Sequence, residues 1–353
     1  MIDFLKYKNK KVFITGHTGF KGGWLLAILN HIGAIVKGYA LAPENKNGIY
    51  LSINGDNLCE SVIGDIRDQK KLENEILNFQ PDFIFHLAAQ PLVRSSYDMP
   101  SETFEINTLG TSYLLESLRK LEKKCIVIII TTDKVYENRE NEIAYNENDR
   151  LGGFDPYSTS KACAELITTS FKKSFFNPES VSIHQKEIAT VRAGNVIGGG
   201  DFSKDRIIPD LINSLKNNQT LIIRNPNSIR PWQHVLEPLI GYLQLGLLME
   251  KEILKYSHAF NFGPEENDHL SVLDLVKEAI AIWGAGNWKI EKQDNLHEAG
   301  ILKLDITRAK KELNWKPRFS SKQAIQQTIE WYRSENSSKI TFAQIKNYLN
   351  LLK

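Results

Sequence analysis

The strongest constraint on the fold is an unbroken apolar run, residues 126–130, that ends in two hydroxyls, an acid and a base. A short run of this kind is typical of a strand buried on both faces of a parallel sheet. Ligands of open α/β sheets bind beyond the carboxyl ends of the strands, which is where Thr131, Thr132, Asp133 and Lys134 fall. The run therefore predicts a parallel sheet and the edge of it at which chemistry takes place.

A tyrosine and a lysine follow this run at four-residue spacing, in Tyr157-Ser-Thr-Ser-Lys161. If the segment is helical, this spacing places the phenol and the ammonium on one face. A nearby ammonium favours the phenolate, so the pair predicts a general base that acts near neutral pH.

A glycine-rich turn stands near the N-terminus, between a short strand at 11–15 and an apolar-periodic helix that includes Trp24. Its glycines, Gly16, Gly19 and Gly22, are spaced three and three. In this setting they let the backbone turn tightly and approach a pyrophosphate at the helix N-terminus. We therefore interpret the turn as a dinucleotide site rather than a plain tight turn.

The next strands carry a weaker cofactor signal. The strand at 34–41 ends without the acid that usually binds the adenosine ribose, Glu44 being the first acid after it, and no arginine stands there for a 2′-phosphate. This strand therefore gives only weak support for NAD over NADP as the cofactor. Asp65 is either an acceptor for the adenine amino group or a helix cap, a role that fits Asp68 better.

Composition excludes several classes of function. With 353 residues and a net charge of +2, the chain gives no electrostatic argument for nucleic acid or an anionic membrane as partner. Its cysteines, Cys59, Cys125 and Cys163, lack metal-ligand spacing, so we predict no metal site and interpret them as buried thiols in a reducing compartment. The sequence shows no signal peptide and no apolar stretch of about 20 residues, so we expect a cytoplasmic protein.

Strands and helices alternate up to residue 197, which predicts a doubly wound parallel sheet of the Rossmann type with right-handed crossovers. Beyond Gly198 the elements become shorter and prolines more frequent, which predicts a smaller C-terminal α/β lobe. We assign residues 1–197 with 232–263 to the dinucleotide-binding domain, and 198–231 with 264–353 to the smaller lobe.

The glycine turn, Thr132, the Tyr157/Lys161 pair and Asn195 together resemble the extended short-chain dehydrogenase/reductase family, over essentially the whole chain. Longer strings are similar to the nucleotide-sugar 4,6-dehydratases of that family, in the branch that uses CDP-sugars. These strings are Thr15-Gly-His-Thr-Gly-Phe-Lys-Gly22, His86-Leu-Ala-Ala-Gln-Pro-Leu-Val-Arg94, Asp133-Lys-Val-Tyr-Glu-Asn138, Arg192-Ala-Gly-Asn-Val-Ile-Gly-Gly-Gly-Asp201 and Ile229-Arg-Pro-Trp-Gln-His-Val-Leu-Glu-Pro238.

The resemblance implies that the first domain binds NAD as cofactor and that the smaller lobe binds the nucleotide sugar, with CDP-glucose as substrate. It also implies a dehydration in three steps. Tyr157, supported by Lys161 and oriented by Thr132, would take the 4-hydroxyl proton while hydride leaves carbon 4. Water would then be lost across carbons 5 and 6, and hydride would return to carbon 6. Helices near 101–120 and 155–175 resemble the dimerising bundle of the family, so we expect a homodimer or homotetramer.

Two catalytic assignments depend on the pair Asp133-Lys134. The resemblance implies that Asp133 protonates the leaving 6-hydroxyl. Relatives of the dTDP-sugar branch carry an Asp-Glu pair here, with the glutamate as base at carbon 5. Lys134 is either that base, with a pKa depressed by burial or by Lys161, or it stabilises the enolate while another group removes the proton.

The resemblance also implies two sets of binding residues. Arginines suit a diphosphate because the guanidinium makes paired charge-assisted hydrogen bonds, although Arg206 and Arg192 fit a structural role equally well. Trp232, His234 and Tyr136 are either site residues or packing residues, and His17 is expected to serve the turn. The predicted cofactor-binding residues are Gly16, Thr18, Gly19, Phe20, Gly22, Asp65, Ile66, Leu87, Ala88, Ala89, Asn107, Tyr157 and Lys161; the predicted substrate-binding residues are Gln90, Arg94, Arg192, Asn195, Arg206, Arg230 and His234.

Three other functions remain open at this point. A nucleotide-sugar 4-epimerase would use Thr132, Tyr157 and Lys161 but has no need of an acid beside Thr132. A dTDP- or UDP-sugar dehydratase would share the reaction and differ in the base. A non-catalytic sensor of NAD or sugar nucleotide would not need the intact Tyr157/Lys161 pair.

Overall fold

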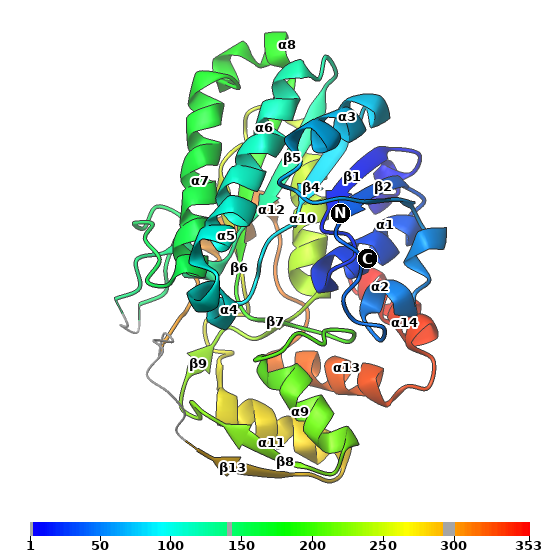
Figure 1. Cartoon of the computed structure of the whole chain (residues 1–353), viewed down its shortest axis with the longest axis vertical. Coiled ribbons are helices and arrows are strands. Elements are labelled where there is room, and N and C mark those ends of the chain that lie inside the picture. Colours follow the sequence, from blue (N-terminus) through cyan, green and yellow to red (C-terminus); the bar gives the residue numbers. More distant parts are fainter. Residues whose placement is uncertain (1–2, 140–142, 292–300) are drawn as a thin grey trace.

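The computed structural model describes residues 3–139, 143–291 and 301–353. Its centre is a seven-stranded parallel sheet in the order β11-β6-β5-β4-β1-β2-β3 (Figure 1). The predicted doubly wound sheet is confirmed. Its strands are β1 (Lys11–Thr15), β2 (Ile35–Ala40), β3 (Glu60–Ile63), β4 (Phe83–His86), β5 (Cys125–Ile130), β6 (Lys186–Ala193) and β11 (Ala259–Phe262).

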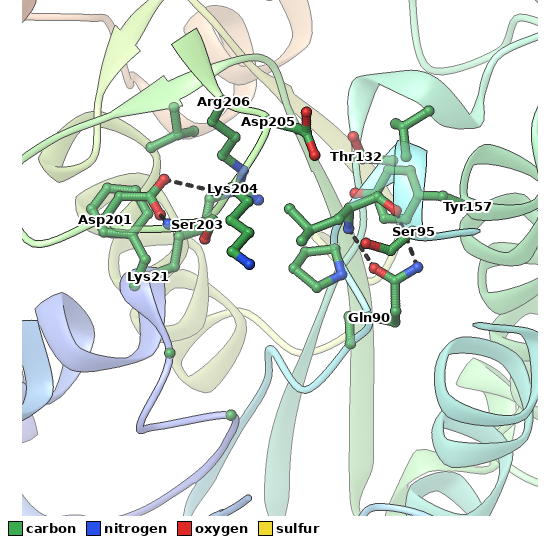
Figure 2. Close-up of a pocket in the computed structure, with 18 of the residues that line it drawn as sticks. Lys21, Gln90, Ser95, Thr132, Tyr157, Asp201, Ser203, Lys204, Asp205 and Arg206 are labelled. Carbon is green, nitrogen blue, oxygen red and sulfur yellow. Dashed lines mark hydrogen bonds and ion pairs between the residues drawn. The ribbon is translucent and has the colours of Figure 1, made fainter. Parts of the chain in front are cut away.

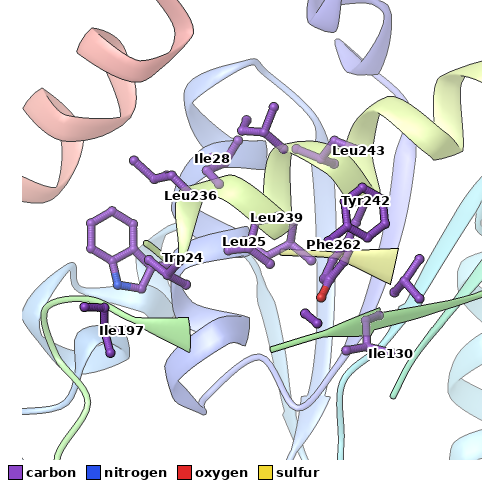
Figure 3. Packing of buried hydrophobic residues seen from close by; sticks show 14 of the residues in the cluster. Trp24, Leu25, Ile28, Ile130, Ile197, Leu236, Leu239, Tyr242, Leu243 and Phe262 are labelled. Carbon is purple, nitrogen blue, oxygen red and sulfur yellow. The ribbon is translucent and has the colours of Figure 1, made fainter. Parts of the chain in front are cut away.

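Helices cover both faces of the sheet because successive strand residues point to opposite sides. In β5, Ile126, Ile128 and Ile130 join the core under α1 (Phe20–His31) and α10 (Leu236–Lys251), as Figure 3 shows for Ile130. Val127 and Ile129 join the opposite core, under α3 (Gln69–Phe79) and α6 (Gly110–Lys120). Burial of each such side chain contributes roughly 1.5–3 kcal/mol to the free energy of folding, so β5 is held firmly in the centre of the sheet.

The predicted helix over 101–120 is interrupted. The chain forms α5 (Pro100–Phe104), one π-helical turn at Glu105–Leu109, and then α6. π-helical turns often occur at functional sites. Here the turn carries the buried Asn107, whose amide exchanges hydrogen bonds with the backbone of Gln90 and donates to Ser160 Oγ.

The last strand region before residue 198 divides into β6 and β7 (Val196–Ile197), with the close-packed Gly194 between them. A Cβ on Gly194 would lie 2.4 Å from Pro231. Beyond β7 the chain builds the second lobe, below the sheet in Figure 1. It contains α9 (Ile207–Lys216), β8 (Thr220–Ile223), β9 (Ile229–Arg230), β12 (Leu270–Ser271), α11 (Val272–Trp283), β13 (Asn287–Ile290) and α13 (Ser321–Arg333), while β10 (Gln233–His234) pairs with β7.

The C-terminal segments differ from the boundaries drawn on the sequence. α12 (Thr307–Leu313) packs against β11 and α10, and α14 (Ser337–Asn350) packs against α1, so both return to the first lobe. In α14, buried Tyr348 reaches Glu237 of α10. The short helices are α2 (Ile49–Ser52), α4 (Val93–Asp98) and α8 (Val181–His184).

Two further expectations can be compared with the fold. The three cysteines are free, but only Cys125 is buried, because Cys59 and Cys163 lie on partly exposed parts of the structure. The prediction of buried thiols is therefore wrong for two of the three. Across the described ranges, no helix combines the length and the apolar character that crossing a bilayer requires.

Candidate active site

A cavity of about 1160 Å³ lies between the two lobes, beyond the carboxyl ends of the strands. Its first-lobe wall is formed by the glycine turn, the segment after β4 and the segment after β5. Its second-lobe wall includes the loop 201–206 and the start of α9. Figure 2 shows Lys21 and Arg206 on one side of it and Thr132 with Tyr157 on the other.

The turn after β5 carries a compact group of three polar side chains. Asp133 is fully buried, and its Oδ1 accepts hydrogen bonds from Thr132 Oγ1 (2.9 Å) and Lys134 Nζ (3.1 Å). Within the described residues, Asp133 Oδ2 has no hydrogen-bond partner. Thr132 and Lys134 line the cavity, whereas the predicted acid Asp133 is fully buried and does not line it. Such a group can hold and transfer a proton beside a bound ligand.

Tyr157 and Lys161 come from the first turns of α7 (Pro156–Ser174). The helix starts here because Asp155 caps it, accepting from Ser158 N at 2.9 Å, and because proline suits the first helical position. The predicted helical spacing is therefore correct, and both side chains line the cavity. Lys161 Nζ donates to the carbonyl oxygen of Ile130, 2.8 Å away.

Burial dominates the ionisation of this pair. It raises the pKa of Tyr157 to about 12, against the opposing effects of the Thr132 hydroxyl and the Arg206 cation. It lowers the pKa of Lys161 to about 8, against the opposing charge of Glu165. Arg206 is the cation that favours the phenolate here, whereas the sequence predicted Lys161 for this role. With a pKa of about 12 the phenol keeps its proton near neutral pH, so these side chains alone do not give the predicted base.

The glycine turn has a geometry that fits a dinucleotide. Gly16 has φ of +78°, and a Cβ there would lie 2.7 Å from Ala88 N. A Cβ on Gly22 would lie 2.0 Å from Gly16 O. The turn therefore needs glycine at both positions, and it directs the N-terminus of α1, capped by Gly19, to the cavity.

Nearly all of the predicted cofactor residues line this part of the cavity. Asp65 does so, with its carboxylate held by Arg67 at 2.7 Å, which lowers its pKa; Asp68 caps α3, as predicted. His17 is buried against Ser61 and serves the turn, as expected. The predicted cofactor residues at the cavity are Gly16, Thr18, Gly19, Phe20, Gly22, Asp65, Ile66, Leu87, Ala88, Ala89, Tyr157 and Lys161.

Sequence reasoning missed Lys21, which lies in the same turn and lines the cavity. Burial and the neighbouring cations Arg206, Lys161 and Lys134 lower its pKa to about 7, while Asp133 raises it. The sequence feature that could have identified Lys21 is its place inside the glycine turn, where the chain is expected to face a ligand.

Cations gather on the substrate side of the cavity. Arg206 Nη1 lies 2.8 Å from Asp201, and Arg94 Nη1 lies 3.8 Å from Asp205. Both guanidinium groups are therefore paired with aspartates, and each has further N–H donors that suit an anionic group such as a diphosphate. The predicted substrate residues at the cavity are Gln90, Arg94, Asn195, Arg206 and Arg230; Tyr136 and Trp232 also line it.

Three predicted ligand contacts are not brought to the cavity. Asn107 uses its amide to fix Gln90 and Ser160. Arg192 is paired with Glu165 inside the core, 2.9 Å away. His234 is fully buried and packs edge-on to Trp24 and Phe319, and burial lowers its pKa to about 3. We correct these three to supporting positions. Among the described residues, no cluster of three metal-ligating side chains exists.

The sheet order, the glycine turn and the Thr132/Tyr157/Lys161 group at its carboxyl edge are those of an extended short-chain dehydrogenase/reductase. More narrowly, the chain belongs to the family described as GDP-mannose 4,6-dehydratase, whose model matches residues 13–328. The family predicted from the sequence is thereby confirmed.

Individual relatives include enzymes of more than one activity. The chain is 48% identical over 335 residues to the CDP-glucose 4,6-dehydratase of Salmonella typhimurium, covering 95% of this chain and 93% of the relative. It is 28% identical to the CDP-paratose 2-epimerase of Salmonella typhi, covering 92% and 99%. Among solved structures, the dTDP-glucose 4,6-dehydratase of Streptomyces venezuelae with NAD bound superimposes with a TM-score of 0.78 at 21% identity, covering 92% and 97%.

Proposed function

We propose that this chain catalyses the NAD-dependent dehydration of CDP-D-glucose to CDP-4-dehydro-6-deoxy-D-glucose, an entry step to deoxysugars of surface polysaccharides. The observation that carries the proposal is the buried Asp133, hydrogen-bonded to Thr132 and Lys134 beside the cavity. An acid at this place is needed to expel water and is not needed to invert carbon 4. The 48% identical relative of that name supports the same reaction.

The chain's own residues divide the work as follows. Tyr157 takes the proton of the 4-hydroxyl, with the Thr132 hydroxyl orienting the phenol. Bound NAD would supply the acceptor and later the donor of the hydride. The ketone at carbon 4 makes the carbon-5 proton acidic, because its loss gives an enolate. Asp133, in its protonated form, then gives a proton to the departing 6-hydroxyl, and the carbon–oxygen bond breaks as the enolate electrons form the double bond between carbons 5 and 6.

Lys134 is positioned to act on the enolate stage. Its ammonium contacts Asp133 at 3.1 Å, and its side chain remains 27% exposed toward the cavity. In this place the ammonium stabilises the enolate oxygen or, once deprotonated, accepts the carbon-5 proton. Solvent deuterium should appear at carbon 5 in either case, since the proton there is replaced during turnover.

Substrate specificity can be tested directly. Purified protein is incubated separately with CDP-glucose, dTDP-glucose and UDP-glucose, and each product is examined by mass and by the alkaline absorbance of a 4-keto-6-deoxy sugar. Loss of water from CDP-glucose alone is the expected result. Dehydration of dTDP-glucose or UDP-glucose would assign a different substrate to the protein. A product of unchanged mass would replace the proposed dehydratase with an epimerase.

We also infer a homodimer or homotetramer that works in the cytoplasm. The support for assembly is apolar exposure on the helices predicted to dimerise: Leu166 of α7 is 57% exposed, and Leu109, which precedes α6, is 44% exposed. Light scattering during size-exclusion chromatography measures the mass; a monomer of 40.2 kDa would overturn the inference.

A further inference from the structure

Behind the catalytic residues lies a buried ion pair that belongs to neither wall of the cavity. Glu165 sits on α7, one turn after Lys161, and Arg192 sits on β6. Their side chains are 3% and 4% exposed. The guanidinium binds the carboxylate through two bonds, Nε to Oε1 at 2.9 Å and Nη2 to Oε2 at 3.1 Å. A bidentate pair of this kind fixes orientation as well as distance.

The carboxylate of Glu165 is saturated by further donors. Thr131 Oγ1 donates to Oε1 at 2.6 Å, and Thr190 Oγ1 donates to Oε2 at 2.7 Å. Glu165 therefore joins α7 to the carboxyl ends of β5 and β6 at one point. Thr131 immediately precedes Thr132, so this bond also holds the start of the catalytic turn.

Arg192 holds the other end of that turn. Its Nη1 donates to Tyr136 Oη at 2.9 Å, and Tyr136 Oη donates to Asn261 Oδ1 of β11 at 2.7 Å. Thr131 and Tyr136 bracket the turn that carries Thr132, Asp133 and Lys134. One ion pair thus anchors the turn on both sides and anchors the helix that carries Tyr157 and Lys161.

We propose that the Glu165–Arg192 pair is a positioning device for the reaction, which holds the Tyr157/Lys161 helix in register with the Thr132–Asp133–Lys134 turn and balances the charge beside Lys161. This role rests on the dehydration proposed above. It goes beyond that function by assigning catalytic consequences to two residues that do not line the cavity.

The charge balance follows from the groups that surround Lys161. Tyr157 and Glu165 lie on its own helix, His86 on β4, Lys21 at the start of α1, and Asp133 with Lys134 on the turn after β5. Burial lowers the pKa of His86 to about 3, so this side chain is neutral at working pH. Glu165 is the group that raises the pKa of Lys161 against burial.

Two single substitutions should therefore act in opposite directions. Glu165→Gln removes the bidentate partner of Arg192 and leaves Glu147 as the carboxylate facing that cation, so Lys161 loses its proton at lower pH. Arg192→Gln removes the guanidinium from Glu165 and leaves Lys161 and Lys172 as the cations facing that carboxylate, so Lys161 keeps its proton to higher pH. If activity needs the Lys161 ammonium, the alkaline limb of the pH profile moves to lower pH in Glu165→Gln and to higher pH in Arg192→Gln.

The experiment records kcat/KM for CDP-glucose from pH 6 to 9.5 in the wild type, both single variants and the double variant Glu165→Gln/Arg192→Gln. We expect a tenfold or greater loss of kcat in each single variant, little change in KM, and limbs displaced by about one pH unit in opposite directions. The double variant should return close to the wild-type limb. The exposed Lys173→Gln, on the same helix, is the matched control and should behave as wild type.

A purely structural role would lower kcat equally at every pH and leave all limbs in place, which would overturn the proposal. If a single variant does not fold, Glu165→Met/Arg192→Met replaces the pair by apolar side chains, a change that buried ion pairs often tolerate. This variant should fold and bind CDP with wild-type affinity but turn over at least tenfold more slowly. A wild-type rate would also overturn the proposal.

A readout without turnover separates this proposal from the proposed function. The pKa of Lys161 is measured by NMR on lysine-labelled protein, with Lys161→Arg assigning the signal. It should fall in Glu165→Gln and rise in Arg192→Gln even if CDP-glucose proves to be the wrong substrate. An unchanged pKa in both variants would refute the charge balance.

Discussion

The ammonium of Lys161 donates a hydrogen bond to the carbonyl oxygen of Ile130, 2.8 Å away. Ile130 is the last residue of β5, so the lysine of α7 is tied to the strand that leads directly into the catalytic turn. The bond satisfies one donor of a buried cation whose pKa is lowered to about 8. The lysine is therefore held in place by the sheet itself.

Replacing Tyr157 by phenylalanine should remove the base that takes the 4-hydroxyl proton. General bases contribute roughly 10²–10⁴-fold to rate, so we expect turnover of CDP-glucose to fall by about that factor. The ring and its packing remain, so folding and NAD binding, measured by circular dichroism and calorimetry, should match the wild type. Near-normal rates would exclude Tyr157 as the base.

Residue patterns were sufficient to predict the parts of the fold that depend on interactions between residues close in sequence. The apolar run 126–130 became a strand buried on both faces, and the Tyr157/Lys161 spacing became one helical face. The glycine turn was predicted for a steric reason that the structure reproduces, since a Cβ on Gly16 or Gly22 would strike the backbone. Periodicity and sterics act locally, so they can be read from the sequence.

Long-range partners could not be predicted in the same way. Arg192 follows the pattern of a substrate arginine, and only the three-dimensional arrangement shows Glu165 beside it, 27 residues away in sequence. The interruption of the helix at Asn107 depends on bonds to Gln90 and Ser160, which no periodicity encodes. The return of α14 to α1 depends likewise on a contact between Tyr348 and Glu237.

Asp133→Asn should separate the oxidation from the elimination. The amide keeps the size of the side chain and a hydrogen-bonding oxygen near Thr132 and Lys134, but it cannot give a proton to the leaving 6-hydroxyl. We expect dehydration to fall by roughly 10²–10⁴-fold while some sugar is still oxidised at carbon 4. Mass spectrometry should find a 4-keto sugar that retains its 6-oxygen. Wild-type water loss would remove the acid role.

Arg230→Ala should weaken binding of the diphosphate. Arg230 lines the cavity, and hydrogen bonds to charged groups contribute roughly 1.5–3 kcal/mol, which corresponds to a KM about 10- to 150-fold higher. The control is Arg333→Ala, on α13 and outside the cavity, which should keep the wild-type KM. Steady-state kinetics with CDP-glucose makes the comparison. An unchanged KM in Arg230→Ala would exclude the diphosphate contact.

The attachment of the C-terminal helix should depend on pH through Glu237. Its carboxylate is buried in α10 and accepts hydrogen bonds from Tyr348 Oη of α14 and from the backbone N–H groups of Arg318 and Phe319. Burial outweighs these bonds and raises its pKa from 4.5 to about 7. The folded protein therefore holds a proton that the unfolded chain releases at lower pH.

The proton bound to Glu237 stabilises the folded protein relative to the unfolded chain. This stabilisation is complete below pH 4.5 and is lost as the pH rises through about 7. One pKa unit corresponds to about 1.4 kcal/mol, so the shift amounts to roughly 3 kcal/mol. Between pH 5 and 8 the free energy of unfolding of the wild type should fall relative to Glu237→Gln by about that amount. Urea unfolding followed by circular dichroism measures it. Glu250→Gln, on the same helix but partly exposed in a pair with Lys10, should show no such difference from wild type. Parallel pH dependences in the wild type and Glu237→Gln would show that Glu237 is ionised in the folded protein throughout this range.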